Sequence, residues 1–150
     1  MLEEDTQQGR YLTFCLGQES YGIEIRCVKE IVGMQPVTPM PEAARFVKGI
    51  INLRGVIIPV IDMRLKFGLP KKSYDERTCI VVIEVDGAAA GLIVDSVAEV
   101  LAIGEENIVP PPAHTGMANR FVKGIGKVGD EVKLLLDSSS LFDQNETIVM

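Results

Sequence analysis

A five-residue segment occurs twice in this chain, half a chain length apart. Phe-Val-Lys-Gly-Ile at 46–50 recurs letter for letter at 121–125, a shift of 75 residues in a chain of 150. At the same shift Val60, Ile61 and Asp62 align with Leu135, Leu136 and Asp137, and Phe67 aligns with Phe142. An ordered series of matches is typical of an internal repeat. We therefore expect two copies of one unit within a single 150-residue domain, at about 11–69 and 78–142.

A second block of matches lies upstream at a different shift. Residues 22–32 align with 91–101 at a shift of 69, so the second copy holds six extra residues between its two blocks. These fall around Pro110, Pro111 and Pro112, where proline predicts a loop because it can extend neither a ladder nor a helix.

Each copy is patterned as short strands. Leu12, Phe14 and Leu16 alternate with more polar neighbours, and the apolar run 78–85 ends at Asp86-Gly87, a pair that favours a tight hairpin turn. The run 56–61 is apolar on both faces but contains Pro59, which predicts an edge or a bulge. Helix is confined to short turns capped by Asp62 and Asp137. The pattern predicts an all-β fold of two small barrels packed on each other.

Composition and charge exclude several classes of function. The 15 basic and 21 acidic residues give a net charge of −6 and no continuous basic surface, so no nucleic-acid partner is expected. The start of the chain lacks signal-peptide features, and the longest uncharged apolar stretches, 55–61 and 87–94, cannot span a bilayer. We expect a cytoplasmic protein with no direct membrane insertion. Cys15, Cys27 and Cys79 have no metal or disulfide spacing, which favours reduced, largely buried thiols.

No motif in the chain supports catalysis. Residues 124–129 match the GxGxxG pattern, but a turn and another strand follow them, so we interpret them as a hairpin. His114 is the only histidine and lies in a proline-rich loop without a nearby triad or metal pattern. Asp62 and Asp137 are explained as helix caps at equivalent positions of the repeat. We expect no catalytic residues, no metal and no cofactor.

The residues of both copies resemble a known family, the CheW-like coupling domains of bacterial chemotaxis. The resemblance covers residues 11–142 and rests on four segments, namely 21–31, 46–55, 56–62 and 91–97. It implies two five-stranded SH3-like barrels. It also implies an adaptor, or scaffold, in signal transduction by a two-component system, which binds the cytoplasmic tip of chemoreceptors and the regulatory domain of the histidine kinase CheA. The chain carries no kinase, phosphotransfer or receiver segment, so CheA-like and CheV-like proteins fit it less well.

Five residues are candidates for binding these partners. Arg54 precedes Gly55 at the end of a strand, where a turn lifts its planar guanidinium away from the core, and the resemblance ties this arginine to receptor coupling. Val28 and Ile31 are expected to share an apolar side while Glu30 points elsewhere, and the resemblance places all three at a receptor-facing groove between the barrels. Gly49 is a position of close backbone approach, either to a partner or within the strand.

Two alternatives stay open at this point. One is an adaptor of a CheA-like pathway for surface motility, which the sequence does not separate from swimming chemotaxis. The other is a β-barrel that binds a small metabolite, which would require a closed polar cavity between the barrels where an adaptor would have aliphatic packing.

Overall fold

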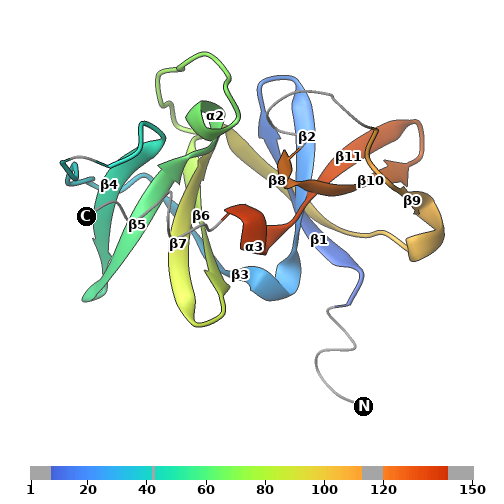
Figure 1. Ribbon diagram of the computed structural model, residues 1–150, viewed down its shortest axis with the longest axis horizontal. Coiled ribbons are helices and arrows are strands. Elements are labelled where there is room, and N and C mark those ends of the chain that lie inside the picture. The colour runs from blue at the N-terminus through green and yellow to red at the C-terminus, as the bar shows by residue number, and fades with distance from the viewer. Residues whose placement is uncertain (1–7, 42, 113–119, 142–150) are drawn as a thin grey trace.

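The chain forms two β-sheets that lie side by side, as the computed structural model shows for residues 8–41, 43–112 and 120–141 (Figure 1). The first sheet has the strand order β8-β1-β2-β11-β10-β9 and the second β3-β6-β7-β5-β4. The strands of the first sheet are β1 Arg10–Leu16, β2 Glu19–Glu24, β8 Ser96–Ala102, β9 Ile108–Val109, β10 Val122–Val128 and β11 Glu131–Leu136. Those of the second are β3 Val28–Gly33, β4 Val47–Leu53, β5 Val56–Asp62, β6 Cys79–Val85 and β7 Ala88–Val94. The all-β fold class predicted from the sequence is confirmed.

Helical structure in the described residues is limited to single turns. The α-helical turns are α2 Met63–Lys66 and α3 Ser138–Leu141, and the 3-10 turns are η1 Ile25–Cys27 and η2 Glu105–Asn107. Asp62 caps α2 by accepting a bond from the Leu65 amide at 3.2 Å. Asp137 precedes α3 and accepts from the Ser139 amide at 3.1 Å. Both predicted caps are therefore confirmed.

The two copies of the repeated segment occupy equivalent positions. The Asp62 amide donates to the Phe46 carbonyl at 2.8 Å, and the Asp137 amide donates to the Phe121 carbonyl at the same distance. The ladders that follow each carry a β-bulge at the same place, between Val47 and Gly49 and between Val122 and Gly124. Phe142, aligned with Phe67 in the sequence, lies outside the described residues.

The sheets do not follow the two halves of the sequence. Strands β1 and β2 of the first half join β8 to β11 of the second, while β6 and β7 of the second half join β3 to β5 of the first. The bounds 11–69 and 78–142 therefore mark the two copies of the repeat, but each sheet contains strands from both copies. This differs from the expectation that each half forms its own barrel. The two halves have exchanged their first hairpins.

Each exchanged hairpin joins the other half through an antiparallel pair, β1 with β8 or β6 with β3, and a parallel pair, β2 with β11 or β7 with β5. Gly22 of β2 pairs with Leu135 of β11, and Gly91 of β7 pairs with Val60 of β5, which are equivalent pairs under the repeat. A Cβ added at Gly22 would lie 2.9 Å from Leu135 Cδ2, and one at Gly91 would lie 2.9 Å from Val60 Cγ1. Glycine at both junctions lets the exchanged hairpin come close to its new neighbour.

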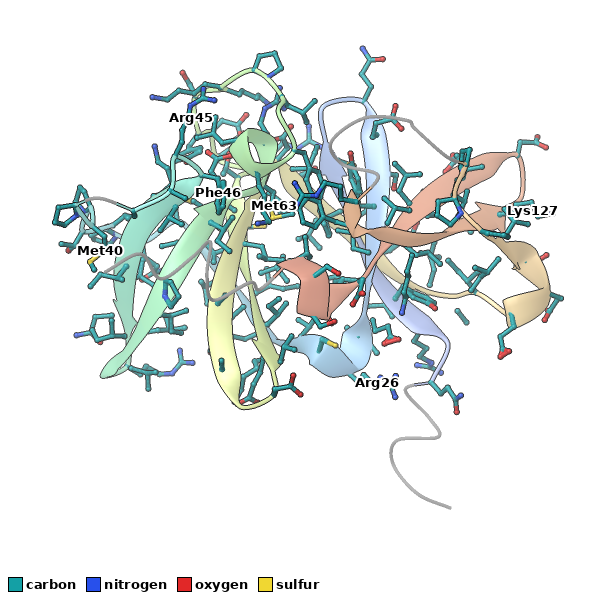
Figure 2. The ribbon with its side chains drawn as sticks, in the orientation of Figure 1. Arg26, Met40, Arg45, Phe46, Met63 and Lys127 are labelled. Atoms are coloured by element: carbon teal, nitrogen blue, oxygen red, sulfur yellow. The ribbon has the colours of Figure 1, made fainter. Side chains whose placement is uncertain are left out.

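An apolar core joins the two sheets, and its side chains fill the space between them (Figure 2). Aromatic rings run through it in sequence, with centroid distances of 5.7 Å from Phe14 to Tyr21, 5.4 Å from Tyr21 to Phe67 and 5.5 Å from Phe67 to Phe121. Aliphatic side chains from both sheets surround the rings, including Leu12, Leu16, Ile23, Ile61, Val81, Ile83, Leu92 and Val94. Each sheet also encloses a separate cluster of buried side chains. The cluster of the second sheet comprises Ile51, Leu53, Ile58, Val60, Ile80, Val82 and Ile93, and that of the first comprises Tyr11, Ile103 and Leu135.

The predicted turns and strand punctuation are largely confirmed. Asp86 and Gly87 have φ values of 53° and 82°, as a tight hairpin turn requires, and residues 124–129 lie in the hairpin of β10 and β11. The prediction for Pro59 needs correction, because β5 is an inner strand. Its residues before Val60 nevertheless pair with β4 alone, so the proline lies where one side of the strand is open. Cys15, Cys27 and Cys79 are free and half-buried.

The exchanged hairpins predict that neither half folds alone. We expect fragments 1–76 and 77–150, expressed separately, to show no cooperative thermal transition by circular dichroism, because each lacks the hairpin that completes its sheet. An equimolar mixture should recover the β spectrum and the transition of the intact chain. Each fragment at doubled concentration is the control. Cooperative unfolding of fragment 1–76 by itself would show that the exchange is not required.

Candidate functional site: a groove on the five-stranded sheet

A groove of about 250 Å³ opens on the five-stranded sheet where β3 approaches the turn between β4 and β5. Its floor is aliphatic and is made by Leu53, Ile58, Val82 and Ala89. Its rim carries Lys29, Glu30, Arg54 and Val56. Val56, on this rim, is 56% exposed and extends the apolar surface of the floor. The groove therefore presents an apolar floor bordered by opposite charges.

Arg54 reaches the rim because of its backbone conformation. With φ of 53° at Arg54 and 89° at Gly55, the two residues form a tight turn, and the Gly55 amide donates to Asn52 Oδ1 at 2.8 Å. The arginine side chain is 68% exposed, and its Nη2 donates to Glu30 Oε2. The sequence predicted Arg54 and Glu30 as separate candidates, and the structure brings them together as an ion pair. Because β3 and β4 are the two edges of the sheet, this contact also shows that the sheet curls into a barrel.

A β-bulge in β3 divides the other candidates between two faces. Val28 lies opposite Ile83, Glu30 opposite Val82 and Ile31 opposite Val81, so the regular alternation is shifted once between Val28 and Glu30. Val28 and Ile31 thus share the face toward the core between the sheets, as predicted, and Glu30 faces the groove. Val28 packs against that core, whereas Ile31 is 43% exposed. The groove itself lies on one barrel, which differs from the expected position between the two barrels.

Gly49 has a role inside the fold and does not line the groove. Its φ is 147°, and an added Cβ would lie 2.1 Å from the carbonyl oxygen of Thr38 and 2.9 Å from Pro39 Cα. The Thr38 and Ile50 amides donate to each other's carbonyls at 2.9 Å, which holds this approach in place. The close backbone approach expected at Gly49 is therefore made to the chain's own 38–39 segment.

The equivalent surface of the other barrel is polar. Under the repeat, Val56, Ile58 and Val82 correspond to Glu131, Lys133 and Thr13. Lys133 is buried and donates to Glu131 Oε1 at 2.9 Å, and the Thr13 hydroxyl donates to the Glu99 carbonyl at 2.7 Å. Among the described residues, three aliphatic positions of the groove are thus polar in the other copy, while Leu53 corresponds to Val128, so the aliphatic lining is not a by-product of the barrel. The sequence could have indicated the floor residues through these positions, because they are aliphatic in one copy of the repeat and polar in the other.

The remaining candidates for chemistry have structural explanations where they are described. Asp62 is buried and accepts from the Tyr74 hydroxyl at 2.7 Å as well as capping α2. Burial, together with this bond and the charge of Asp62, raises the pKa of Tyr74 above its usual range. His114 lies outside the described residues. Among the residues that are described, no three His, Cys, Asp or Glu side chains cluster as a metal site, and no helix is long and apolar enough to cross a membrane.

The fold and the groove define a class of protein: a small, duplicated all-β protein that presents an apolar, charge-rimmed surface suited to binding. Comparison with known proteins narrows this class. The model of the CheW-like domain matches residues 10–146. The chain is 38% identical to the chemotaxis protein CheW of Klebsiella aerogenes, over 97% of this chain and 88% of that protein. It is also 38% identical to the chemotaxis protein CheW of Treponema pallidum, over 93% and 85%.

A solved structure agrees with these relatives. The crystal structure of the scaffolding protein CheW from Thermoanaerobacter tengcongensis superposes with a TM-score of 0.81 at 42% identity, covering 86% of this chain and 88% of that one. The chain belongs to the CheW-like family.

The structural role of Gly49 predicts a large loss of stability on substitution. Gly49→Ala should lower the free energy of unfolding by about 3 kcal/mol or more, because the methyl group meets backbone atoms at a strained φ. Gly33→Ala is the matched control: Gly33 ends β3, nothing lies within 4 Å of its Cβ position, and its change should stay within about 1 kcal/mol. Urea unfolding measures both. Equal stability of the two variants would contradict the packing described for Gly49.

Proposed function

We propose that this protein is a non-catalytic cytoplasmic adaptor of bacterial chemotaxis that links the cytoplasmic tips of chemoreceptors to the regulatory domain of the kinase CheA. The observation that carries the proposal is the aliphatic groove with its Glu30–Arg54 rim, whose positions 56, 58 and 82 correspond to polar residues in the other barrel, in a chain of the CheW-like family. An adaptor works by holding partners in a fixed geometry, so its chemistry is association and requires no cofactor.

The groove has the features of a site for a helical partner. A receptor tip of helical hairpins would offer apolar side chains at helical spacing, and Leu53, Ile58 and Val82 would desolvate one of them. The charges of Lys29, Glu30 and Arg54 would then set register and exclude partners of the wrong charge pattern. We assign the groove to the receptor; Ile31 is an exposed apolar residue on the other face of the same strand.

The Glu30–Arg54 pair is better suited to recognition than to stability. An exposed ion pair contributes about 0–1 kcal/mol to folding, so little is lost when Arg54 turns to a partner. The guanidinium has five donors in a plane, and a single described contact to Glu30 leaves several of them for a carboxylate or carbonyl of the receptor. The ion pair thus orients Arg54 before binding, and Arg54 can leave Glu30 for a group of the partner at little cost.

A linking function also needs a second, separate surface. Val100 on β8 and Val132 on β11 are 47% and 52% exposed and belong to the other sheet. We propose that this six-stranded side is available to the kinase while the groove holds the receptor. Each interface of a transient signalling complex is weak, with burial near or below about 1,200 Å². Many simultaneous contacts in a receptor array would give the assembly its strength.

Two other functions are weighed against this proposal. An adaptor of a CheA-like pathway for surface motility would use the same surfaces, and only the identity of its receptors would distinguish it. Binding of a small metabolite between the barrels is disfavoured, because aromatic and aliphatic side chains of both sheets fill that space.

Arg54 gives the sharpest test of this proposal. Arg54→Ala should weaken binding of the receptor tip by about 5- to 150-fold, equivalent to roughly 1–3 kcal/mol, because oriented hydrogen bonds at a contact are lost. Its free energy of unfolding should change by no more than about 1 kcal/mol. Arg54→Lys should restore little, since lysine lacks the planar fork. Binding of receptor-tip and CheA regulatory-domain fragments, each alone, and kinase activation in reconstituted arrays measure these effects.

Arg45→Ala is the control, because Arg45 is an exposed arginine outside the groove and should behave as wild type. Normal receptor binding and normal kinase activation by Arg54→Ala would contradict the role of the groove. A large loss of thermal stability would instead identify Arg54 as a structural residue.

A further inference from the structure

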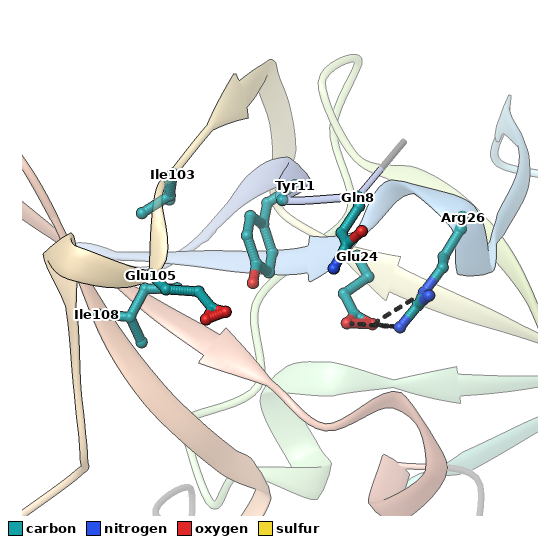
Figure 3. A pocket seen from close by; sticks show the side chains of 8 residues that line it. Gln8, Tyr11, Glu24, Arg26, Ile103, Glu105 and Ile108 are labelled. Carbon is teal, nitrogen blue, oxygen red and sulfur yellow. Dashed lines mark hydrogen bonds and ion pairs between the residues drawn. The ribbon is translucent and has the colours of Figure 1, made fainter. Parts of the chain in front are cut away.

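A small pocket of about 150 Å³ opens beside the start of β1, the end of β2 and the η2 turn (Figure 3). It shares no lining residue with the groove on the other sheet. Its wall combines two isoleucines, Ile103 and Ile108, with the polar side chains of Tyr11, Glu24, Arg26 and Glu105. The pocket has room for one side chain and is too small for most metabolites.

The corresponding region of the other barrel is filled. Under the repeat, Tyr11, Glu24 and Ile103 correspond to Ile80, Ile93 and Met34. Ile80 and Ile93 are buried in the interior cluster of the five-stranded sheet, and Met34 packs against them. The pocket therefore arises from a tyrosine and a glutamate at positions that the other copy fills with aliphatic side chains. Barrel geometry alone does not require it.

The Tyr11 hydroxyl opens into this pocket without a hydrogen-bond partner among the described residues. Tyr11 is only 7% exposed, and Figure 3 shows its hydroxyl directed into the space between Glu24 and Glu105. No described residue within the ranges given above makes a hydrogen bond with this hydroxyl, although Lys123 Nζ lies 6.0 Å from the centre of its ring. No buried side-chain oxygen or nitrogen of the described residues lacks a partner, so this hydroxyl reaches the open space of the pocket, where a ligand can bond to it.

The two carboxylates differ in how they are engaged. Glu24 accepts from Lys123 at 2.9 Å and from Arg26 at 3.2 Å. Burial tends to raise the pKa of Glu24, but the bonds and charges of Lys123 and Arg26 outweigh it and lower that pKa. Glu105 has no ion pair or side-chain hydrogen bond with any residue in the described part of the chain. The pocket thus contains the carboxylate of Glu24, which is ion-paired, and the carboxylate of Glu105, which is free to accept hydrogen bonds. The Tyr11 hydroxyl lies between them (Figure 3).

We propose that this pocket binds the aliphatic cationic side chain of a lysine or arginine from a protein partner. The methylene stem packs on Ile103, Ile108 and the Tyr11 ring, as long cationic side chains do on apolar surfaces. The ammonium or guanidinium head donates to the Tyr11 oxygen and to the Glu105 carboxylate. An anion would meet Glu105 and find Arg26 already occupied by Glu24, so charge selects a cation.

The test is an amide-detected NMR titration of the full chain with Nα-acetyl-lysine methylamide. Nα-acetyl-norleucine methylamide is the ligand control, since it keeps the aliphatic stem and lacks the charge. A third ligand, 1,4-diaminobutane, tests whether the pocket takes the ammonium group from a free small amine. Tyr11→Phe keeps the ring and removes only the hydroxyl, and Glu105→Gln removes only the charge. Glu106→Gln is the matched control, because this neighbouring glutamate does not line the pocket.

The lysine derivative should give saturable shifts at Gly9, Ile103 and Glu105, and the norleucine derivative should give none there. Tyr11→Phe and Glu105→Gln should each weaken binding about fivefold or more, while Glu106→Gln should stay within about twofold. Equal binding of the norleucine derivative, or affinity unchanged in both pocket variants, would overturn the proposal. Binding of diaminobutane without binding of the lysine derivative would overturn it as well, because a partner's side chain would then be excluded.

Discussion

The apolar core between the two sheets is the interaction on which the rest of the structure depends. It is built from both halves of the chain, because the hairpin of β1 and β2 and the hairpin of β6 and β7 each complete the sheet of the other half. Glycine at positions 22 and 91 makes the parallel junctions narrow enough for this exchange. Neither sheet can therefore move far without disrupting the other, and a rigid body of this kind suits a protein that holds two partners at a fixed separation.

Within this common frame the two barrels have acquired different surfaces. The five-stranded barrel keeps aliphatic side chains at Val56, Ile58 and Val82, and it adds an arginine turn that reaches Glu30 across the closure of the sheet. The other barrel places a buried lysine and a glutamate at the equivalent positions. The two copies of the repeat share one backbone arrangement, so the difference between their surfaces at these positions comes from the side chains.

Much of this arrangement follows from local sequence rules, while the exchange does not. The caps at Asp62 and Asp137, the turn at Asp86-Gly87 and the exposure of Arg54 depend on neighbouring residues, so the pattern predicts them. The pairing of Glu30 with Arg54 depends on how the sheet closes, a long-range property that periodicity does not contain. For the same reason the repeat predicted two barrels but not that each is assembled from both halves, since hairpins of equal pattern can pair in either copy.

The most direct test of the account is to locate where a receptor tip binds. A methyl-labelled sample titrated with a receptor-tip fragment should show its largest shifts at Leu53, Val56, Ile58 and Val82, the aliphatic side chains of the groove. The corresponding side of the other barrel, reported by Val128 at the position equivalent to Leu53, should be unaffected by that fragment. Shifts centred on Val128, or divided equally between the two barrels, would contradict the claim that side-chain differences between the copies define the binding surface.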